Sequence, residues 1–164
     1  MHTKFLSLFL TLGIILFTVP GASAQDVSAD DQALMRQAYQ EIRDAQATGN
    51  YDLAISKMDA AYALYENLFN TKYSSNAGLF KDIANLSYEK GELAYDNHHN
   101  ATARQAYEKA FNLFSQLDKA VGPDLDNKFR MFVILLHFSE MSKQEGKLAE
   151  AKEYLRNAGG TWAF

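Results

Sequence analysis

Apolar residues recur at steps of three and four residues almost throughout the chain after residue 28, and no segment alternates apolar and polar residues as a half-buried strand does. Ala54, Met58, Ala61, Tyr65 and Leu68 form one such series. This spacing places the apolar side chains on one face of a helix, and that face must pack against neighbouring helices. The pattern therefore predicts an all-α protein.

Short breaks divide the pattern into six helices. Ser28 or Asp30 is expected to cap the first helix, which ends near Ala47. The other helices are expected at about residues 51–69, 79–96, 101–120, 125–144 and 148–158. Gly49 and Gly146 stand in two tight turns, where a positive φ is needed. Tight and longer connections alternate, so the six helices are expected to form three antiparallel hairpins.

One segment resembles a buried strand when it is taken alone. The sequence FRMFVILLHF, from Phe129 to Phe138, has a β-branched centre. Because no partner strand occurs elsewhere in the chain, we interpret it as a helix that is buried on nearly all sides. Such a helix would occupy a central position, with helices packed on both flanks.

Three stretches of the chain share the same arrangement of small and large residues. A small residue lets two helices approach closely, a larger one fills the gap a turn later, and a second small one follows. The three sets are Ala54, Met58 and Ala61; Ala103, Tyr107 and Ala110; and Ala151, Leu155 and Ala158. In the second unit, His98 stands where the first and third units have Gly49 and Gly146.

This arrangement resembles the tetratricopeptide repeat, and Gly91 stands where that family places a small residue in its first helix. The resemblance covers most of the chain as three units and implies a right-handed α-solenoid. The period differs, because the anchoring alanines lie 49 and 48 residues apart whereas the standard repeat has about 34 residues. An ordinary antiparallel helical bundle is the alternative fold.

The resemblance also implies a function, because in this family the first helices of successive hairpins line a groove that accepts a peptide or partner segment. Tyrosines in such a groove offer a large contact area with a polar tip, although they would serve equally well for packing between hairpins. The matching positions are Arg36, Tyr39 and Arg43; Asn85, Tyr88, Glu92 and Tyr95; and Val133, Leu136, Glu140 and Lys143.

The first 24 residues have the pattern of a secretory signal peptide. An apolar run from Phe5 to Val19 follows Lys4, and Ala22-Ser23-Ala24 provides a cleavage site. The run is shorter than the roughly 20 residues of a membrane-spanning helix, although an uncleaved anchor is the alternative. We therefore expect a secreted or periplasmic protein that begins at Gln25 and has no stable membrane anchor.

The remaining composition narrows the class of function. Removal of Lys4 leaves 15 basic and 20 acidic side chains without a basic block, which argues against nucleic acid as a partner. The chain has no cysteine, so its stability must come from packing. No motif for an enzyme or a cofactor occurs, and we expect neither.

The histidines supply one alternative function. His98 and His99 lie in a predicted polar turn, and His137 lies in the most apolar helix, where a neutral histidine with a hydrogen-bond partner is expected. A small exported helical bundle that uses these residues to hold a ligand or metal is the first alternative. An enzyme of unrecognised type is the second.

The sequence thus predicts a signal peptide at residues 1–24, a helical domain at 25–158 and an aromatic tail at 159–164. The tail contains Trp162 and Phe164, which would fold back onto the last two helices or insert into a groove of another molecule. The expected function is that of an exported scaffold or adaptor that binds a protein or peptide in the groove of the first helices.

Overall fold

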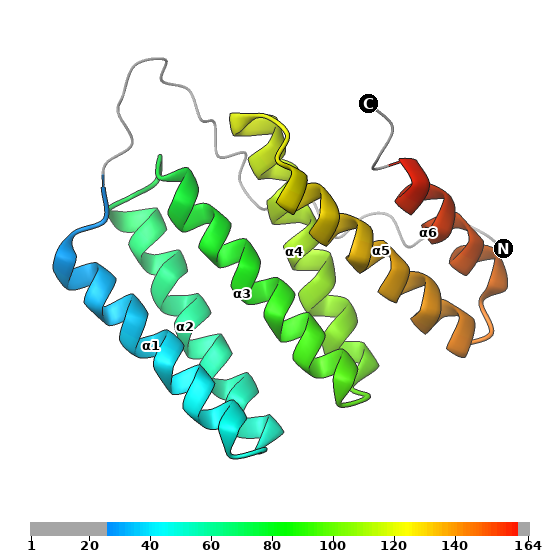
Figure 1. The fold of residues 1–164 in the computed structure, drawn as a ribbon, viewed down its shortest axis with the longest axis horizontal. Helices are drawn as coiled ribbons and strands as arrows, with labels where there is room; N and C mark the ends of the chain where they lie inside the picture. Colours follow the sequence, from blue (N-terminus) through cyan, green and yellow to red (C-terminus); the bar gives the residue numbers. More distant parts are fainter. Residues whose placement is uncertain (1–25, 161–164) are drawn as a thin grey trace, which may run out of the picture.

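The computed structural model describes residues 26–160; the predicted signal peptide and Thr161–Phe164 of the predicted tail lie outside the described residues. Six helices and no strand make up this part of the chain, which confirms the all-α prediction (Figure 1). They are α1 (Ala29–Ala47), α2 (Tyr51–Thr71), α3 (Ala77–Asp96), α4 (Asn100–Val121), α5 (Leu125–Gln144) and α6 (Leu148–Gly160).

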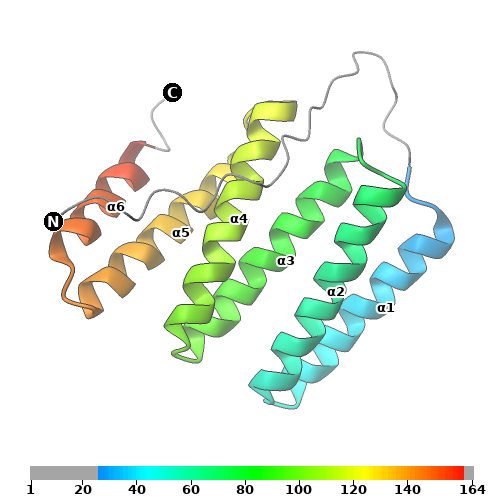
Figure 2. The same cartoon turned by 180° about the vertical axis from the view of Figure 1, so that it is seen from behind.

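The helices form three hairpins, α1/α2, α3/α4 and α5/α6, that follow one another in a row (Figures 1 and 2). Each helix packs mainly against its neighbours in the sequence. The helices α1, α3 and α5 lie toward the viewer in Figure 1, and α2 and α4 lie toward the viewer in Figure 2. This two-layered row of hairpins, held together by local contacts, is the arrangement of an α-solenoid. None of the described helices is both long and apolar enough to cross a bilayer.

The turns follow the sequence closely. Gly49 and Gly146 have φ values of 69° and 75°, as predicted. His98 has a φ of 62° and takes the same role in the turn between α3 and α4. The side chain of Ser28 caps α1 by accepting a hydrogen bond from the backbone N–H of Asp31. Side-chain and backbone preferences at these few positions therefore fix where the helices begin and end.

The start of α1 is attached to the rest of the structure by a buried carboxylate. Asp31 accepts hydrogen bonds from the hydroxyl of Tyr73 at 2.6 Å, the ammonium of Lys72 at 3.1 Å and the hydroxyl of Ser28 at 2.9 Å. These hydrogen bonds, that from Tyr73 first, lower the pKa of Asp31. The ionised side chain thus links the first turn of α1 to the connection between α2 and α3.

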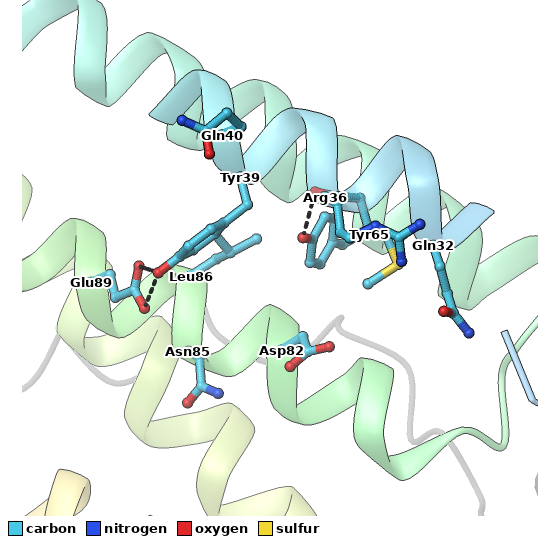
Figure 3. A pocket seen from close by; sticks show the side chains of 10 residues that line it. Gln32, Arg36, Tyr39, Gln40, Tyr65, Asp82, Asn85, Leu86 and Glu89 are labelled. Atoms are coloured by element: carbon cyan, nitrogen blue, oxygen red, sulfur yellow. Dashed lines mark hydrogen bonds between the residues drawn. The ribbon is translucent and has the colours of Figure 1, made fainter. Parts of the chain in front are cut away.

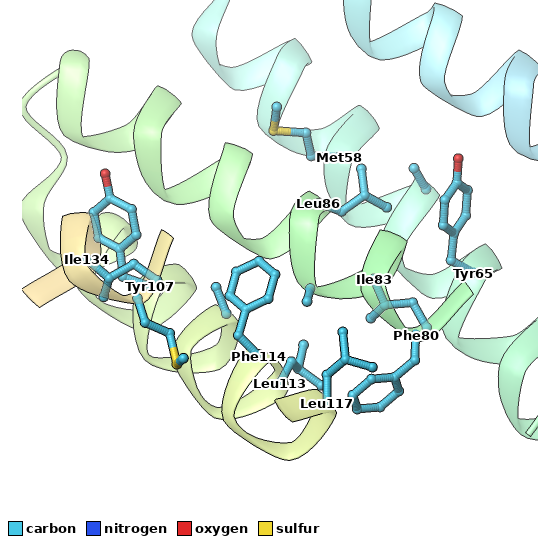
Figure 4. Close-up of a cluster of buried hydrophobic side chains, with 14 of the residues drawn as sticks. Met58, Tyr65, Phe80, Ile83, Leu86, Tyr107, Leu113, Phe114, Leu117 and Ile134 are labelled. Atoms are coloured by element: carbon cyan, nitrogen blue, oxygen red, sulfur yellow. The ribbon is translucent and has the colours of Figure 1, made fainter. Parts of the chain in front are cut away.

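The core runs along the interior of the row, between the two layers of helices (Figure 4). The alanines of the repeated arrangement are all buried, as are Met58 and Tyr107. Leu155 does not pack as predicted, since it is 52% exposed. The reason is its place in α6, the last helix of the described chain, which no following hairpin covers.

The segment from Phe129 to Phe138 is helical, as predicted, and α4 and α6 pack on its flanks. The prediction that it is buried on nearly all sides is wrong. Ile134 is fully buried, but Phe129 is 53% exposed and Leu136 is 36% exposed. The helix lies in the last hairpin rather than at the centre, so one of its faces has no neighbour.

Two helices approach each other closely where Gly91 of α3 faces Tyr107 of α4. A Cβ atom on Gly91 would lie 2.5 Å from the ring of Tyr107, which is far inside van der Waals contact. Tyr107 is fully buried, and because protein interiors are closely packed, a shift of its ring would disturb the side chains around it. Only glycine at position 91 is compatible with this packing.

We therefore expect Gly91→Ala to lower the free energy of unfolding by about 1–3 kcal/mol, because the added methyl group overpacks a rigid part of the core. Urea unfolding followed by circular dichroism measures the effect. Gly159→Ala is the control, since a Cβ there meets no atom within 4 Å and alanine favours the helix. Equal stability of Gly91→Ala and the unmodified protein would contradict the packing described.

Candidate binding groove

A groove of about 620 Å³ lies between α1 and α3 (Figure 3). Its walls come from one side of each helix, because residues three and four apart stand above one another along a helix. It is lined by Gln32, Met35, Arg36, Tyr39 and Gln40 of α1, by Tyr65 of α2, and by Asp82, Asn85, Leu86 and Glu89 of α3.

The floor of the groove is buried and largely apolar. Leu86 and Tyr65 are both buried, and the Tyr65 hydroxyl donates a hydrogen bond to the backbone carbonyl of Met35 at 3.1 Å. Burial raises the pKa of Tyr65 to about 12, so its hydroxyl stays protonated at neutral pH. The floor is therefore built before any ligand arrives, and it links the first hairpin across the base of the groove.

The α3 wall carries two carboxylates and one amide. Burial raises the pKa values of both Asp82 and Glu89, and nearby positive charges only partly oppose this effect. Glu89 receives long hydrogen bonds of 3.4 and 3.5 Å from the Tyr39 hydroxyl. Between them along the helix, the side-chain oxygen of Asn85 is buried and has no hydrogen-bond partner in the described structure. This wall therefore has acceptor groups whose hydrogen-bonding capacity is not fully used by residues 26–160.

The α1 wall is polar and cationic. Arg36 lines the groove and has no ion-pair or hydrogen-bond partner among residues 26–160. Tyr39 is 37% exposed, and its ring crosses the groove toward Glu89 (Figure 3). The two walls thus have opposite charge and face one another across an apolar floor, an arrangement that suits a ligand with both donors and acceptors along its length.

The structure brings together three of the predicted binding residues and separates the others. Arg36, Tyr39 and Asn85 line the groove. Arg43 lies one turn farther along α1, outside the lining, although its charge acts on Glu89. The α5 residues Val133, Leu136, Glu140 and Lys143 do not line this groove; Glu140 and Lys143 form an ion pair at 3.6 Å.

The remaining predicted residues, Tyr88, Glu92 and Tyr95, pack between the second and third hairpins. Glu92 accepts hydrogen bonds from the Tyr107 hydroxyl at 2.5 Å and from Nε2 of His137 at 3.2 Å. The His137 ring stacks on Tyr107 and lies 4.2 Å, centroid to centroid, from the ring of Tyr95. Tyr95 therefore packs between hairpins, which is the alternative role that the sequence allowed for the tyrosines.

Tyr88 belongs to the same cluster. Its ring lies 6.1 Å from that of Tyr107, and the guanidinium of Arg130 lies over it at 5.0 Å. A cation placed over an aromatic face stabilises the contact between α3 and α5. Tyr88 is therefore committed to holding two hairpins together and is not free in the way that Tyr39 is.

Seven of the ten lining residues were not predicted as binding residues from the sequence, among them the polar residues Gln32, Gln40, Asp82 and Glu89. Asp82, Asn85 and Glu89 are spaced by three and four residues. This spacing predicts that Asp82 and Glu89 lie on the same side of α3 as Asn85. Nothing in the sequence separated Asp82 and Glu89 from the many solvated carboxylates of the other helices. Their unusual environment depends on the approach of α1.

The histidines of the turn between α3 and α4 have structural contacts. His99 stacks on Tyr51 with the ring centroids 4.2 Å apart and the planes nearly parallel. Within residues 26–160, no group of three or more histidine and acidic side chains is arranged to hold a metal ion.

A second, smaller hollow of about 190 Å³ lies among α2, α3 and α4. Its charged groups already have partners: Lys90 pairs with Asp59 at 2.5 Å, and the Lys109 ammonium lies 3.5 Å from the centre of the Tyr62 ring. The hollow is thus smaller than the α1–α3 groove, and its polar groups are already engaged. We therefore take the α1–α3 groove as the candidate site.

Comparison with known proteins found no matching family model, no similar curated protein and no similar solved structure.

The environments of Glu92 and Glu89 predict opposite effects of a Glu→Gln substitution on the free energy of unfolding; Glu92 is considered first. Burial alone would raise the pKa of Glu92, but hydrogen bonds from His137 and two tyrosines outweigh it and lower the pKa. Its ionised form therefore stabilises the folded protein above the ordinary pKa of 4.5, and this contribution is lost as the pH falls below that value. Glu92→Gln should lower the free energy of unfolding at pH 7 by about 1 kcal/mol or more, and less at pH 3.

Urea unfolding at the two pH values measures this difference. Glu153→Gln is the matched control, because Glu153 is 63% exposed and forms only a 3.8 Å surface pair with Arg156. A Glu92→Gln effect that is no larger than the control, or that does not change with pH, would show that Glu92 does not couple the hairpins.

Proposed function

We propose that this protein is an exported adaptor of tetratricopeptide-repeat type that binds an extended segment of a protein partner in the groove between α1 and α3. The mechanism is recognition, with no chemistry carried out on the partner. The proposal combines the resemblance of the three hairpins to that family with the signal-peptide pattern of residues 1–24, which favours the periplasm or the cell exterior.

The observation that carries the proposal is the side-chain oxygen of Asn85. It is buried at the groove and lacks a hydrogen-bond partner within the described structure. A buried acceptor without a partner lowers stability by about 1–3 kcal/mol, and such groups are uncommon in folded proteins. A backbone N–H of a bound peptide would satisfy the oxygen, and the amide nitrogen of the same side chain would bond a peptide carbonyl.

The charges of the two walls narrow the kind of segment that fits. Arg36 has no partner within the described chain and would pair with an acidic side chain of the ligand. Asp82 and Glu89, on the facing wall, would pair with basic side chains. Ion pairs between a protein and its ligand fix the direction and register of the ligand more than they add affinity. A segment with both acidic and basic residues therefore suits the groove best.

The raised pKa values of Asp82 and Glu89 support a role in binding. A carboxylate whose pKa is raised by burial destabilises the folded protein when it is ionised, and such groups often mark functional sites. Selection for stability alone would favour a neutral side chain at these positions.

Glu89→Gln should therefore leave the free energy of unfolding at pH 7 unchanged or raise it by up to about 1 kcal/mol. Because the folded state takes up a proton at a higher pH than the unfolded state, lowering the pH stabilises the unmodified protein and narrows the difference. Urea unfolding at pH 7 and pH 4 tests this. A clear loss of stability at pH 7 would mean that Glu89 is a structural residue, as Glu92 is.

Binding is tested by selecting a display library of random linear peptides on the unmodified protein. We expect selected peptides to lose at least tenfold in affinity on a Tyr39→Ala/Asn85→Ala variant, which removes about 1.4 kcal/mol or more of contacts. They should bind normally to Asn112→Ala, in which an exposed amide on α4 is removed. Circular dichroism checks that each variant is folded.

Retention of full affinity by a folded Tyr39→Ala/Asn85→Ala variant would place the peptide site elsewhere. Failure to select any peptide on the unmodified protein would count against an extended peptide as the ligand.

A further inference from the structure

The two carboxylates of the groove have different surroundings, although both stand on the α3 wall. Asp82 and Glu89 are seven residues apart, which is about 10 Å along the helix. Glu89 lies opposite Tyr39, whereas Asp82 lies toward Gln32 at the other end of the groove (Figure 3). The two ends of the groove therefore need not present the same charge to a ligand.

At the Glu89 end, other side chains of the protein compensate for the carboxylate charge. Glu89 accepts hydrogen bonds from the Tyr39 hydroxyl at 3.4 and 3.5 Å. The positive charges of Arg130 on α5 and Arg43 on α1 also act on it. A cation of the ligand would meet two arginines here as well as the carboxylate, so this end attracts basic groups only weakly.

At the other end, the charge of Asp82 has little compensation. Among the described residues, Lys81 is the one charged group that acts on Asp82. The Lys81 ammonium is already paired with Asp124 at 2.7 Å and lies 3.4 Å from Asp126, both at the start of α5. Within the same part of the chain, Asp82 has no hydrogen bond or ion pair of its own. Its carboxylate is therefore available to a cation of the ligand.

The α1 wall carries the opposite charge, and its arginines lie farther along the groove. The helices α1 and α3 run in the same direction (Figure 1), and the hydrogen bonds from Tyr39 to Glu89 place these two residues level with one another. Counting from this level, Asp82 lies about 6 Å before Arg36 and about 16 Å before Arg43. Neither arginine has an ion-pair partner within the described part of the chain. The available charges therefore follow one another as negative, positive and positive.

We propose that the groove selects a segment with the complementary order of charges: a basic side chain on Asp82 and acidic side chains on Arg36 and Arg43. This inference rests on the proposed function, and it adds which charged residues of the segment lie at which end of the groove. An extended chain advances about 3.3 Å per residue. The acidic residues of the segment therefore lie about two and about five positions from the basic one.

This order of charges also determines which segments are rejected. A segment with only basic residues would place one of them beside Arg36 and Arg43, and a segment with only acidic residues would place one beside Asp82. Like charges that meet across an interface suppress the binding of wrong partners. The apolar floor, with Leu86 and Tyr65, offers the same surface to every segment, so the charged residues provide the discrimination.

Reversal of the charge at Asp82 tests the proposal. The library of random linear peptides is selected on the unmodified protein and on Asp82→Lys, and affinities are measured by fluorescence anisotropy. Peptides selected on the unmodified protein should contain both basic and acidic residues, and replacement of the basic residue by glutamate should weaken their binding at least tenfold. On Asp82→Lys the same replacement should strengthen binding. Glu153→Lys is the matched control and should behave as the unmodified protein, because Glu153 is 63% exposed and lies on α6, outside the groove.

The α1 wall supplies the reciprocal test. Arg36→Glu/Arg43→Glu should weaken the binding of the same peptides at least tenfold, and replacement of their acidic residues by lysine should restore it. Arg156→Glu is the control for this wall, because Arg156 is 79% exposed on α6. Circular dichroism checks that each variant is folded. Asp82→Asn, which keeps the size of the side chain, is the second variant at the α3 wall; it should lose the preference for a basic residue without gaining one for an acidic residue.

Two results would overturn the proposal and leave the proposed function standing, when the peptides still lose affinity on Tyr39→Ala/Asn85→Ala. One is full affinity after the basic residue of the peptide is replaced. The other is an unchanged charge preference of the peptides selected on Asp82→Lys. Peptides that bind Tyr39→Ala/Asn85→Ala with full affinity, or a selection that yields no peptide, would contradict the proposed function and this inference together.

Discussion

The contact between Gly91 and Tyr107 determines how the second and third hairpins are placed. The absence of a side chain at Gly91 lets the Tyr107 ring lie directly on α3, with no solvent exposure. From there the Tyr107 hydroxyl donates a hydrogen bond to Glu92, which also accepts one from His137 of α5. The His137 ring stacks on the ring of Tyr107. One small residue therefore fixes α4 against α3 and, through a shared carboxylate, α5 against both.

This arrangement explains why the candidate groove lies between α1 and α3. At the contact between α3 and α5, large side chains on both helices are used for packing and hydrogen bonding, with Tyr95 and Tyr88 held against His137 and Arg130. Among the described residues, α1 has no comparable cluster facing α3. Within the same residues, only the long hydrogen bonds from the Tyr39 hydroxyl to Glu89 cross from one helix to the other near the groove, so a hollow is left between them.

The sequence predicted the helices well because their periodicity and turn residues are local properties. Gly49, Gly146 and His98 all have the left-handed conformation that their positions require. The sequence did not show which tyrosines line a groove. Tyr39 and Tyr88 have similar charged surroundings along the chain, yet one crosses the groove and the other packs beside Tyr107. That difference depends on which helix comes to lie opposite, and the same limitation produced the errors at Phe129 and Leu155.

The three faces of α3 have different roles. Together they explain how this helix can carry polar groups that lower the stability of the fold, in a protein without disulfides. One face, with Leu79, Ile83 and Leu86, is buried in the core, and another, with Gly91 and Glu92, holds the adjoining hairpins. Asp82, Asn85 and Glu89 occupy the face that is left. Because burial of the first two faces fixes the helix, unfavourable polar groups on the third have little effect on its position. The unsatisfied oxygen of Asn85 is held on this third face, and under the proposed function a bound segment that supplied a donor would offset part of the instability that its burial causes.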